Sequence, residues 1–339
     1  MAHNSQHPAQ CNIKSIFSVA VVLGACFVSG QAYSQSVNMD FSNEYNANSI
    51  HAQGDAYFID SVRELTNDDV NITLHTGGAL GFNSGDHFYA VADGAIEMAD
   101  TLSGTMSGID SIFLLSSLPF IVEDIEDARR LYEIAKPHYE AVFEENDQIL
   151  LYASPWPPSG IWSQNAINDQ ADLSNLKIRT FDRNGTETFR NVGAAPVSLS
   201  WGDVVPQLAT GGITAVLTSA EAGANGSFWE HQDHFAAIQY AIPLNMVHMN
   251  KSVFDALSAE QQDAILEAAR LTDLHNWETV ETRTAENYQT LSQHDVTIND
   301  AVSPALTDAL AQAASSVVEN WLESAGDRGQ EILGQFRGE

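Results

Sequence analysis

Both cysteines of this 339-residue chain, Cys11 and Cys26, lie within its first 34 residues. The remaining residues therefore contain no thiol that can form a disulfide, act as a nucleophile or bind a metal ion. A body of roughly 305 residues without cross-links depends entirely on a buried apolar core, and that length is ample for such a core. It also favours two domains over one.

The segment 1–34 has the features of an export signal. Lys14 is its only charged residue, and an apolar run of about ten residues follows. Ala32 and Ser34 then place small side chains before a cut at Gln35. We therefore expect residues 1–34 to be a removable signal peptide and the mature protein to be exported.

Two other interpretations of this segment stay open. A membrane anchor would need about 20 apolar residues to span a bilayer, and this run is far shorter. The sequence Leu-Gly-Ala-Cys at 23–26 also resembles the site at which lipoproteins are modified, which would attach a lipid to Cys26. A better small-residue cleavage site lies downstream, so we favour the form without an anchor.

The chain is strongly acidic, with 45 Asp and Glu against 14 Lys and Arg and a net charge of −31. Such a surface repels nucleic acid and anionic lipid, so we expect neither as a partner. Only 17% of the residues are charged and 44% are hydrophobic, which indicates a globular protein and not a disordered acidic segment.

Strand and helix patterns alternate along the body, which predicts an α/β fold. Strands are expected at 37–41, 70–74, 149–153, 177–181, 195–199 and 213–217, within 236–250, and at 296–298. Helices are expected at 51–65, from 86, at 125–146 with a kink or break at Pro137, at 201–210, from 258 to about 293, and from 304 to about 336. The helix after 258 is long enough to cross two lobes.

No motif of a common enzyme or cofactor site occurs. The glycine-rich stretch at 77–81 lacks the GxGxxG pattern and the following Lys-Ser/Thr pair that cradle phosphates. The eleven histidines include no HExxH pair, and there is no GxSxG nucleophile elbow. We expect no catalysis, no cofactor and no metal, with an exported hydrolase or lyase as the least favoured alternative.

Arg179 is the most informative single residue, because cations are scarce and this one stands in the apolar strand predicted at 177–181. A guanidinium group at a strand end can grip a carboxylate through two parallel hydrogen bonds. The alternative is an ion pair with one of the many acidic side chains. Three tryptophans on loops after strands are candidate pocket walls, with core packing as the alternative: Trp156, Trp162 and Trp201.

Several segments, in a fixed order, resemble the solute-binding proteins of tripartite ATP-independent periplasmic (TRAP) transporters, the DctP-like family. They cover nearly the whole body: 78–81 (GALG), 91–97 (VADGAIE), 117–120 (SLPF), 173–179 (LSNLKIR), 193–197 (GAAPV), 201–205 (WGDVV), 207–212 (QLATGG) and 257–262 (LSAEQQ). No single segment is specific, but the ordered set is.

The resemblance implies a periplasmic binding protein-like fold, in which two α/β lobes close on a ligand and the long helix spans both. Lobe I would comprise 35–150 with about 243–285, and lobe II 151–242 with about 286–339. The ligand would be a small organic acid gripped by Arg179, with Trp201 against it. The protein would be a periplasmic monomer that delivers this ligand to TRAP permease subunits in the membrane.

One loop differs from the family pattern. Where many members have Asp-Gly-x-Glu-Asn, this chain has TAVLTSAE at 214–221, so the polar contact would fall to a residue near its end. Glu44 and Glu221 could face an ammonium group, which leaves an amino-acid-like or amine ligand open, and a sensor-linked binding protein is a further alternative. The predicted ligand-binding residues are Arg179, Trp201, Trp156, Trp162, Phe181, Thr218, Ser219, Glu221, Glu44 and Asn245.

Overall fold

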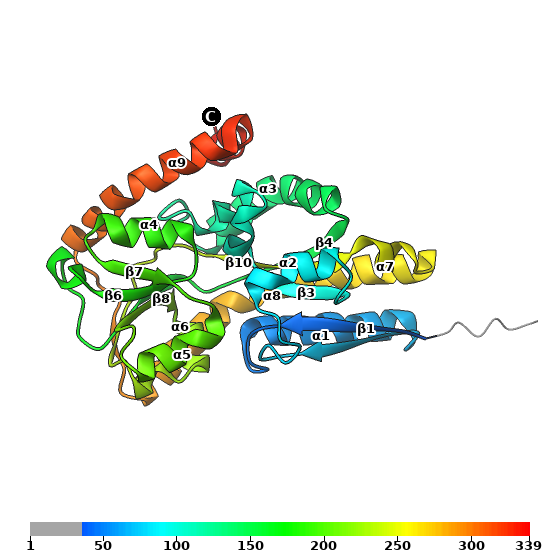
Figure 1. Cartoon of the computed structure of the whole chain (residues 1–339), viewed down its shortest axis with the longest axis horizontal. Coiled ribbons are helices and arrows are strands. Elements are labelled where there is room, and N and C mark those ends of the chain that lie inside the picture. The colour runs from blue at the N-terminus through cyan, green and yellow to red at the C-terminus, as the bar shows by residue number, and fades with distance from the viewer. Residues whose placement is uncertain (1–35) are drawn as a thin grey trace, which may run out of the picture. The chain divides into compact units, whose positions relative to one another are not determined.

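A computed structural model describes residues 36–339, which form two β-sheets with helices packed around them (Figure 1). The predicted signal peptide at 1–34, and with it the alternative of a lipid on Cys26, lies outside the described residues. Within residues 36–339, no helix combines the length and apolarity that crossing a bilayer requires. The same range holds no group of three or more His, Cys, Asp or Glu side chains arranged to bind a metal ion.

Sheet 1 has the strand order β2-β1-β3-β10-β4. Its strands are β1 (Val37–Asn43), β2 (Val70–His75), β3 (Met98–Leu102), β4 (Gln148–Pro155) and β10 (Leu244–Asn250). β1 pairs in parallel with β2 and β3, whereas β10 runs antiparallel to both β3 and β4. A late segment of the chain therefore returns to complete the sheet that residues 37–155 begin.

Sheet 2 has the strand order β11-β9-β5-β8-β6-β7. Its strands are β5 (Ser159–Ser163), β6 (Lys177–Thr180), β7 (Ala195–Ser198), β8 (Ala215–Ser219), β9 (His234–Ala236) and β11 (Thr297–Asn299). β6 is parallel to β7 and β8, while β5 is antiparallel to β8 and β9. The carboxyl ends of β6 and β8 consequently lie at one edge of this sheet.

Helices connect most of the strands, and several begin at a side-chain cap that satisfies a free backbone N–H, as Ser49 does for Ala52. The α-helices are α1 (Ile50–Thr66), α2 (Ser84–Ala92), α3 (Ile125–Glu145), α4 (Arg183–Asn191), α5 (Trp201–Ala209), α6 (Ala220–Asn225), α7 (Lys251–Asp255), α8 (Ala259–Gln293) and α9 (Pro304–Arg337). Four short 3-10 helices are η1 (Ser103–Gly108), η2 (Ser111–Ser117), η3 (Gln170–Leu173) and η4 (Phe228–Glu230).

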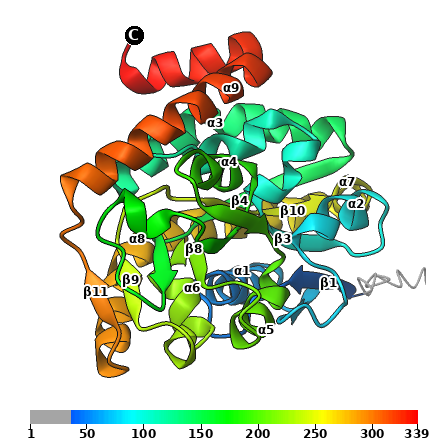
Figure 2. The same cartoon turned by 60° about the vertical axis from the view of Figure 1, so that its left-hand side comes forward.

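The 35-residue helix α8 contacts elements of both sheets. It begins at a capping box, in which Ser258 and Gln261 exchange side-chain hydrogen bonds to each other's backbone. α8 packs on α1 and β4 beside sheet 1 and on α6 and β11 beside sheet 2 (Figure 2). The long helix predicted from 258 to about 293 is therefore present.

The apolar face of sheet 1 packs against α1 and α8. Phe41 of β1 and Phe58 of α1 are fully buried and meet edge to face, with ring centroids 6.5 Å apart. Tyr152 of β4 and Ile265 of α8 are buried in the same cluster. Burying each such side chain stabilises the fold by about 1.5–3 kcal/mol relative to leaving it in water. This core carries the stability of a body that has no disulfide.

Helix α3 and strands β3 and β5 differ from the predicted pattern. Of the kink or break expected at Pro137, the break is absent, because α3 continues through this residue. Ala135 and Tyr139 on either side of this proline are buried, and their packing outweighs the lost backbone hydrogen bond. Strands β3 and β5 were not predicted, because both are short, are buried along their whole length and contain small or polar residues without alternation.

A buried ion pair joins α8 to parts of the chain that belong to different sheets. Arg283 of α8 lies 2.7 Å from the carboxylate of Glu221, whose side chain is 0% exposed. Glu221 follows β8 of sheet 2 and accepts a hydrogen bond from the backbone N–H of Ile50, which begins the helix after β1. Arg283 also donates to the backbone carbonyl of Asn48. This cluster fixes three segments at one point.

We expect Arg283→Met to lower the free energy of unfolding by about 3–5 kcal/mol, because it leaves the Glu221 carboxylate buried without a partner. Urea denaturation measures the change. Arg63→Met is the matched control, since Arg63 of α1 makes an exposed ion pair with Asp60 and its removal should cost less than about 1 kcal/mol. Equal effects of the two substitutions would contradict a structural role for the buried pair.

Candidate functional site

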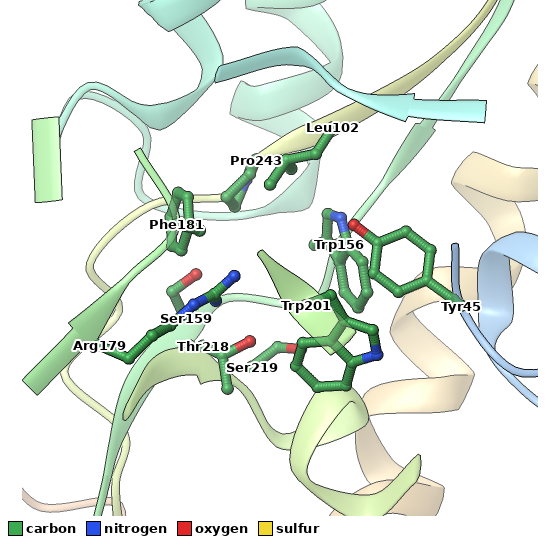
Figure 3. Close-up of a pocket in the computed structure, with 10 residues that line it drawn as sticks. All are labelled: Tyr45, Leu102, Trp156, Ser159, Arg179, Phe181, Trp201, Thr218, Ser219 and Pro243. Atoms are coloured by element: carbon green, nitrogen blue, oxygen red, sulfur yellow. The ribbon is translucent and has the colours of Figure 1, made fainter. Parts of the chain in front are cut away.

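A cavity of about 330 Å³ lies between the two sheets, where the carboxyl ends of several strands face one another (Figure 3). β1, β3 and β4 of sheet 1 contribute residues at or just beyond their ends, and β6 and β8 of sheet 2 do the same. Open α/β sheets commonly bind ligands in this position. We call it the aromatic cavity, and it is lined by Tyr45, Leu102, Trp156, Ser159, Arg179, Phe181, Trp201, Thr218, Ser219 and Pro243.

Among residues 36–339, Arg179 is the only cation that lines this cavity. Its Nε and Nη2 donate hydrogen bonds to the backbone carbonyl of Leu199, at 3.0 and 2.9 Å. Its side chain makes no ion pair within residues 36–339, although the residue is only 4% exposed. A guanidinium group has five N–H donors, so most of them remain for a ligand.

Burial and neighbouring groups both affect the pKa of Arg179. Burial lowers the pKa of Arg179, and the nearby Tyr45, Glu44 and Asp182 partly offset this effect. A guanidinium group nevertheless stays protonated in proteins. The site therefore presents a desolvated positive charge, for which an anion is the natural partner.

Aromatic rings form the wall opposite Arg179. The ring centroid of Tyr45 lies 5.0 Å from that of Trp156 and 6.0 Å from that of Trp201. The imidazole of His51 lies behind this wall, with its centroid 4.0 Å from that of Trp156. Both Trp156 and Tyr45 are buried, so the wall is rigid and apolar.

A second cavity, of about 390 Å³, adjoins the first and shares Arg179, Trp201, Leu102 and Phe181 with it. We call it the polar cavity, because its other residues are mostly polar: Glu44, Asn83, Ser84, Gly85, Thr105, Ser198, Leu199 and Ser200. Glu44 accepts a hydrogen bond from the Ser84 hydroxyl. Burial raises the pKa of Glu44, while Ser84 and Arg179 favour its ionised form.

The hydroxyl groups of the lining differ in their availability. Ser219 caps helix α6 by accepting a hydrogen bond from the N–H of Ala222. Thr218 and Ser159 make no side-chain hydrogen bond within residues 36–339, and both line the aromatic cavity. Thr218 and Ser159 are therefore the hydroxyls that can bond a ligand without breaking a bond in the protein.

The structure brings seven of the ten predicted residues to the two cavities and leaves three elsewhere. Arg179, Trp201, Trp156, Phe181, Thr218 and Ser219 line the aromatic cavity, and Glu44 lines the polar cavity. Trp162, Glu221 and Asn245 line neither.

Trp162 lies on the far side of sheet 2. Side chains alternate between the faces of a strand, so Ser159 and Trp162, three residues apart in β5, point to opposite faces. Trp162 packs against Phe228 and Phe235, and its Nε1 donates to the backbone carbonyl of Ser219. It belongs to the core, which was the alternative interpretation of this tryptophan.

Glu221 and Asn245 are engaged by the protein itself. Both carboxylate oxygens of Glu221 are used within the cluster around Arg283. Asn245 of β10 lies one layer behind the cavity wall, where its Oδ1 accepts a hydrogen bond of 2.8 Å from Trp156 Nε1. Asn245 therefore supports a lining residue without reaching the cavity.

Four lining residues were missed by the sequence analysis: Tyr45, Leu102, Ser159 and Pro243. A signal existed for Tyr45, since it is an aromatic residue directly after a predicted strand, as Trp156 and Trp201 are. Leu102 and Ser159 lie in β3 and β5, which the sequence pattern did not reveal. Pro243 reaches the site only because β10 returns to sheet 1.

Asp182 is a buried acid just behind the cavity. It caps α4 by accepting a hydrogen bond of 2.9 Å from the N–H of Gly185 through Oδ1, while its Oδ2 has no hydrogen-bond partner. Burial raises the pKa of Asp182 to about 6, against the opposing effect of its hydrogen bonds and of the Arg179 charge. Asp182 thus contributes negative charge near Arg179 without pairing with it.

Comparison with known proteins adds a second line of evidence. A family model described as bacterial extracellular solute-binding protein, family 7 (DctP), matches residues 41–324. The ectoine-binding periplasmic protein TeaA of Halomonas elongata is 23% identical over 278 residues, which cover 80% of this chain and 81% of TeaA.

Solved structures resemble this one over nearly their whole length. DctP6 of Bordetella pertussis, an extracytoplasmic solute receptor binding pyroglutamic acid, superposes with a TM-score of 0.86 at 25% identity and covers 89% of this chain and all of its own. A TRAP solute-binding protein from a marine metagenome, specific for pyroglutamate, gives a TM-score of 0.85 at 26% identity and covers 90% of this chain and all of its own.

We expect Asp182→Asn to stabilise the protein at neutral pH and to have little effect in acid. A folded pKa of about 6 lies above the ordinary value of 3.8, so the stability linked to this group is full below about pH 3.8 and is lost as the pH rises through 6. Asparagine keeps the cap and removes the ionisation, which should recover up to about 3 kcal/mol at pH 7–8.

Melting temperatures across this pH range measure the effect. Asp169→Asn is the matched control, because Asp169 is an exposed aspartate that caps η3 in the same way. The difference in melting temperature between Asp182→Asn and wild type should grow as the pH rises through 6, whereas Asp169→Asn measures what the exchange of a capping aspartate for asparagine does by itself. A gain at Asp182 that is no larger at pH 8 than in acid would show that burial of Asp182 has no electrostatic cost.

Proposed function

Because the chain belongs to the bacterial extracellular solute-binding protein family 7 (DctP), we propose that it captures a small carboxylate in the aromatic cavity and delivers it to a TRAP permease. One observation carries this proposal. Arg179 is a buried guanidinium group with no acidic partner within residues 36–339. An isolated buried charge is costly, and a ligand carboxylate would supply the missing partner through two charge-assisted hydrogen bonds.

The lining favours a ligand with a single carboxylate on a compact, weakly polar ring. Of the residues that the structure describes, one cation lines the aromatic cavity, and Glu44 beside it would repel a second anionic group. The rings of Tyr45, Trp156 and Trp201 offer flat apolar surfaces. Pyroglutamate, which the two structural neighbours bind, has this form, since it is a five-membered lactam with one carboxylate.

A zwitterion is the second candidate, because Glu44 and Arg179 border the polar cavity together. A ligand that spans them would place its carboxylate on Arg179 and a cationic nitrogen toward Glu44. TeaA, which is 23% identical to this chain, is named for ectoine, which combines a carboxylate with a cyclic amidine. Glu44 would attract the cationic nitrogen of a zwitterion, whereas for a cyclic monocarboxylate it would only repel a second anionic group.

The remaining assignments follow from the same family. We propose that residues 1–34 are removed on export and that the mature protein works in the periplasm as a monomer. We expect it to bind no nucleic acid and to act neither as an enzyme nor as a sensor subunit. Sheets 1 and 2 would be the cores of the two lobes, with 35–150 and 243–285 in lobe I and 151–242 and 286–339 in lobe II. The intact mass of the exported protein separates cleavage before Gln35 from a lipid on Cys26.

We expect Arg179→Ala to weaken carboxylate binding by on the order of 30- to 1,000-fold, since removing one partner of a buried charge pair costs about 2–4 kcal/mol. A thermal-shift screen of organic acids, amino acids and amines, with pyroglutamate and ectoine included, selects the ligand, and calorimetry gives its affinity. Arg190→Ala removes an exposed arginine of α4 and should leave affinity unchanged. If a carboxylate ligand from the screen binds Arg179→Ala as tightly as the wild type, Arg179 does not bind the ligand carboxylate.

Glu44→Gln separates the two ligand classes. For a cyclic monocarboxylate, we expect affinity to stay equal or to rise by up to about tenfold, because a nearby negative charge is removed. For a zwitterion, we expect a loss of about tenfold or more, because a charge-assisted hydrogen bond is lost. Calorimetry with pyroglutamate and with ectoine measures both, and Glu97→Gln, on an acid outside both cavities, is the control.

A further inference from the structure

Two aspartates lie together behind the aromatic wall. Asp55 of α1 is 1% exposed and Asp100 of β3 is 0% exposed. The Nδ2 of Asn43 donates hydrogen bonds to both, 2.7 Å to Asp55 Oδ2 and 3.0 Å to Asp100 Oδ2. One amide nitrogen can bridge two carboxyl groups only when they are close, and these two lie within hydrogen-bonding reach of each other.

Hydrogen bonds connect this pair to the cavity wall. Asp100 Oδ1 accepts from Asn245 Nδ2 at 2.9 Å, and Asn245 Oδ1 accepts from Trp156 Nε1 at 2.8 Å. On the other side, the Oδ1 of Asn43 accepts from the backbone N–H of Tyr45 at 2.7 Å. Two of the three aromatic residues of the wall, Trp156 and Tyr45, are therefore held by side chains that the aspartates orient.

Neither aspartate makes an ion pair with any group in residues 36–339. Asp55 accepts a hydrogen bond from Tyr152 of β4, and the amide of Asn276 in α8 lies against the neighbouring Gly54. Glu44 and Tyr45, after β1, add no positive charge.

Two histidines stand near the pair, and both are neutral. Burial lowers the pKa of His51, one helical turn before Asp55, to about 3, and that of His87 of α2 to about 4. Two adjacent carboxylates without a counter-charge repel each other strongly in a buried site. Desolvation by burial raises the pKa of Asp55 to about 7 and that of Asp100 well above its ordinary value, and the charge of Asp55 raises the pKa of Asp100 further.

We propose that Asp55 and Asp100 share one proton and act as positioning residues for the ligand cavity, fixing Trp156 through Asn245 and Tyr45 through Asn43. With one proton, the carboxyl of Asp100 donates to Asp55 while its Oδ1 still accepts from Asn245. Loss of that proton places two negative charges side by side, and the chain of hydrogen bonds to Trp156 loosens. The inference rests on the proposed function only in that the ligand occupies the aromatic cavity.

The ring of Trp156 reports directly on this chain, so the test needs no ligand. Protein labelled with 5-fluorotryptophan gives a fluorine resonance for each tryptophan, and Trp156→Phe identifies that of Trp156. We expect this resonance to move in one titration step between about pH 5 and about pH 9. The step should vanish in Asp100→Asn, whose amide can accept from Asn245 and donate to Asp55 but gives up the hydrogen bond from Asn43 Nδ2, and which cannot ionise.

Two further variants complete the test. Tyr152→Phe removes a hydrogen bond that favours the ionised form of Asp55, so the step should move to higher pH. Asp60→Asn replaces an exposed aspartate of the same helix α1 and should leave the step unchanged. Should Asp100→Asn fail to fold, the shift in Tyr152→Phe decides.

A Trp156 resonance that ignores pH in the wild type would overturn the proposal. So would a step that survives unchanged in both Asp100→Asn and Tyr152→Phe. Because the experiment is done without ligand, neither result bears on the carboxylate anchor, and a failed ligand screen leaves this test intact.

Discussion

The unpaired charge of Arg179 is the constraint on which the site depends. In a chain with 45 acidic residues, a cation could easily find a carboxylate partner, yet this one bonds only a backbone carbonyl. Glu44 and Asp182 lie near enough to affect its pKa but make no ion pair with it. The nearby acids thus reduce the free-energy cost of burying the Arg179 charge without neutralising it. A carboxylate ligand can supply the missing ion-pair partner.

The acidic partners that Arg179 lacks are used elsewhere. Glu221, two residues after β8, forms an ion pair with Arg283. It also accepts a hydrogen bond from the N–H of Ile50 and so connects the end of β8 to the beginning of α1. Asp55 and Asp100 support the aromatic wall from behind. Buried charged groups in residues 36–339 therefore have three different roles. Arg179 is available to a ligand, Glu221 and Arg283 form an ion pair between segments, and the carboxyl groups of Asp55 and Asp100 support the aromatic wall.

Local patterns predicted the α/β class, the long helix α8 and two residues that line the cavities, Arg179 within a strand and Trp201 just after one. Local patterns did not predict which face of a sheet a side chain occupies when that depends on how its strand pairs with its neighbours. Whether Trp162 faces the ligand or the core is decided by the pairing of β5 with β8 and β9, and the short buried β5 has no pattern of its own. Glu221 was misassigned because its partner Arg283 is distant in sequence. Tyr45 met the rule applied to the tryptophans and could have been found.

The central position of β10 has a consequence for how the chain folds. β3 and β4 flank β10 and do not touch as neighbours, so sheet 1 stays divided until residues 244–250 have emerged. A nascent chain that ends before residue 244 would leave two open strand edges, which are templates for aggregation. Contacts of such long range slow folding. Slow folding is compatible with the export that we propose for this chain.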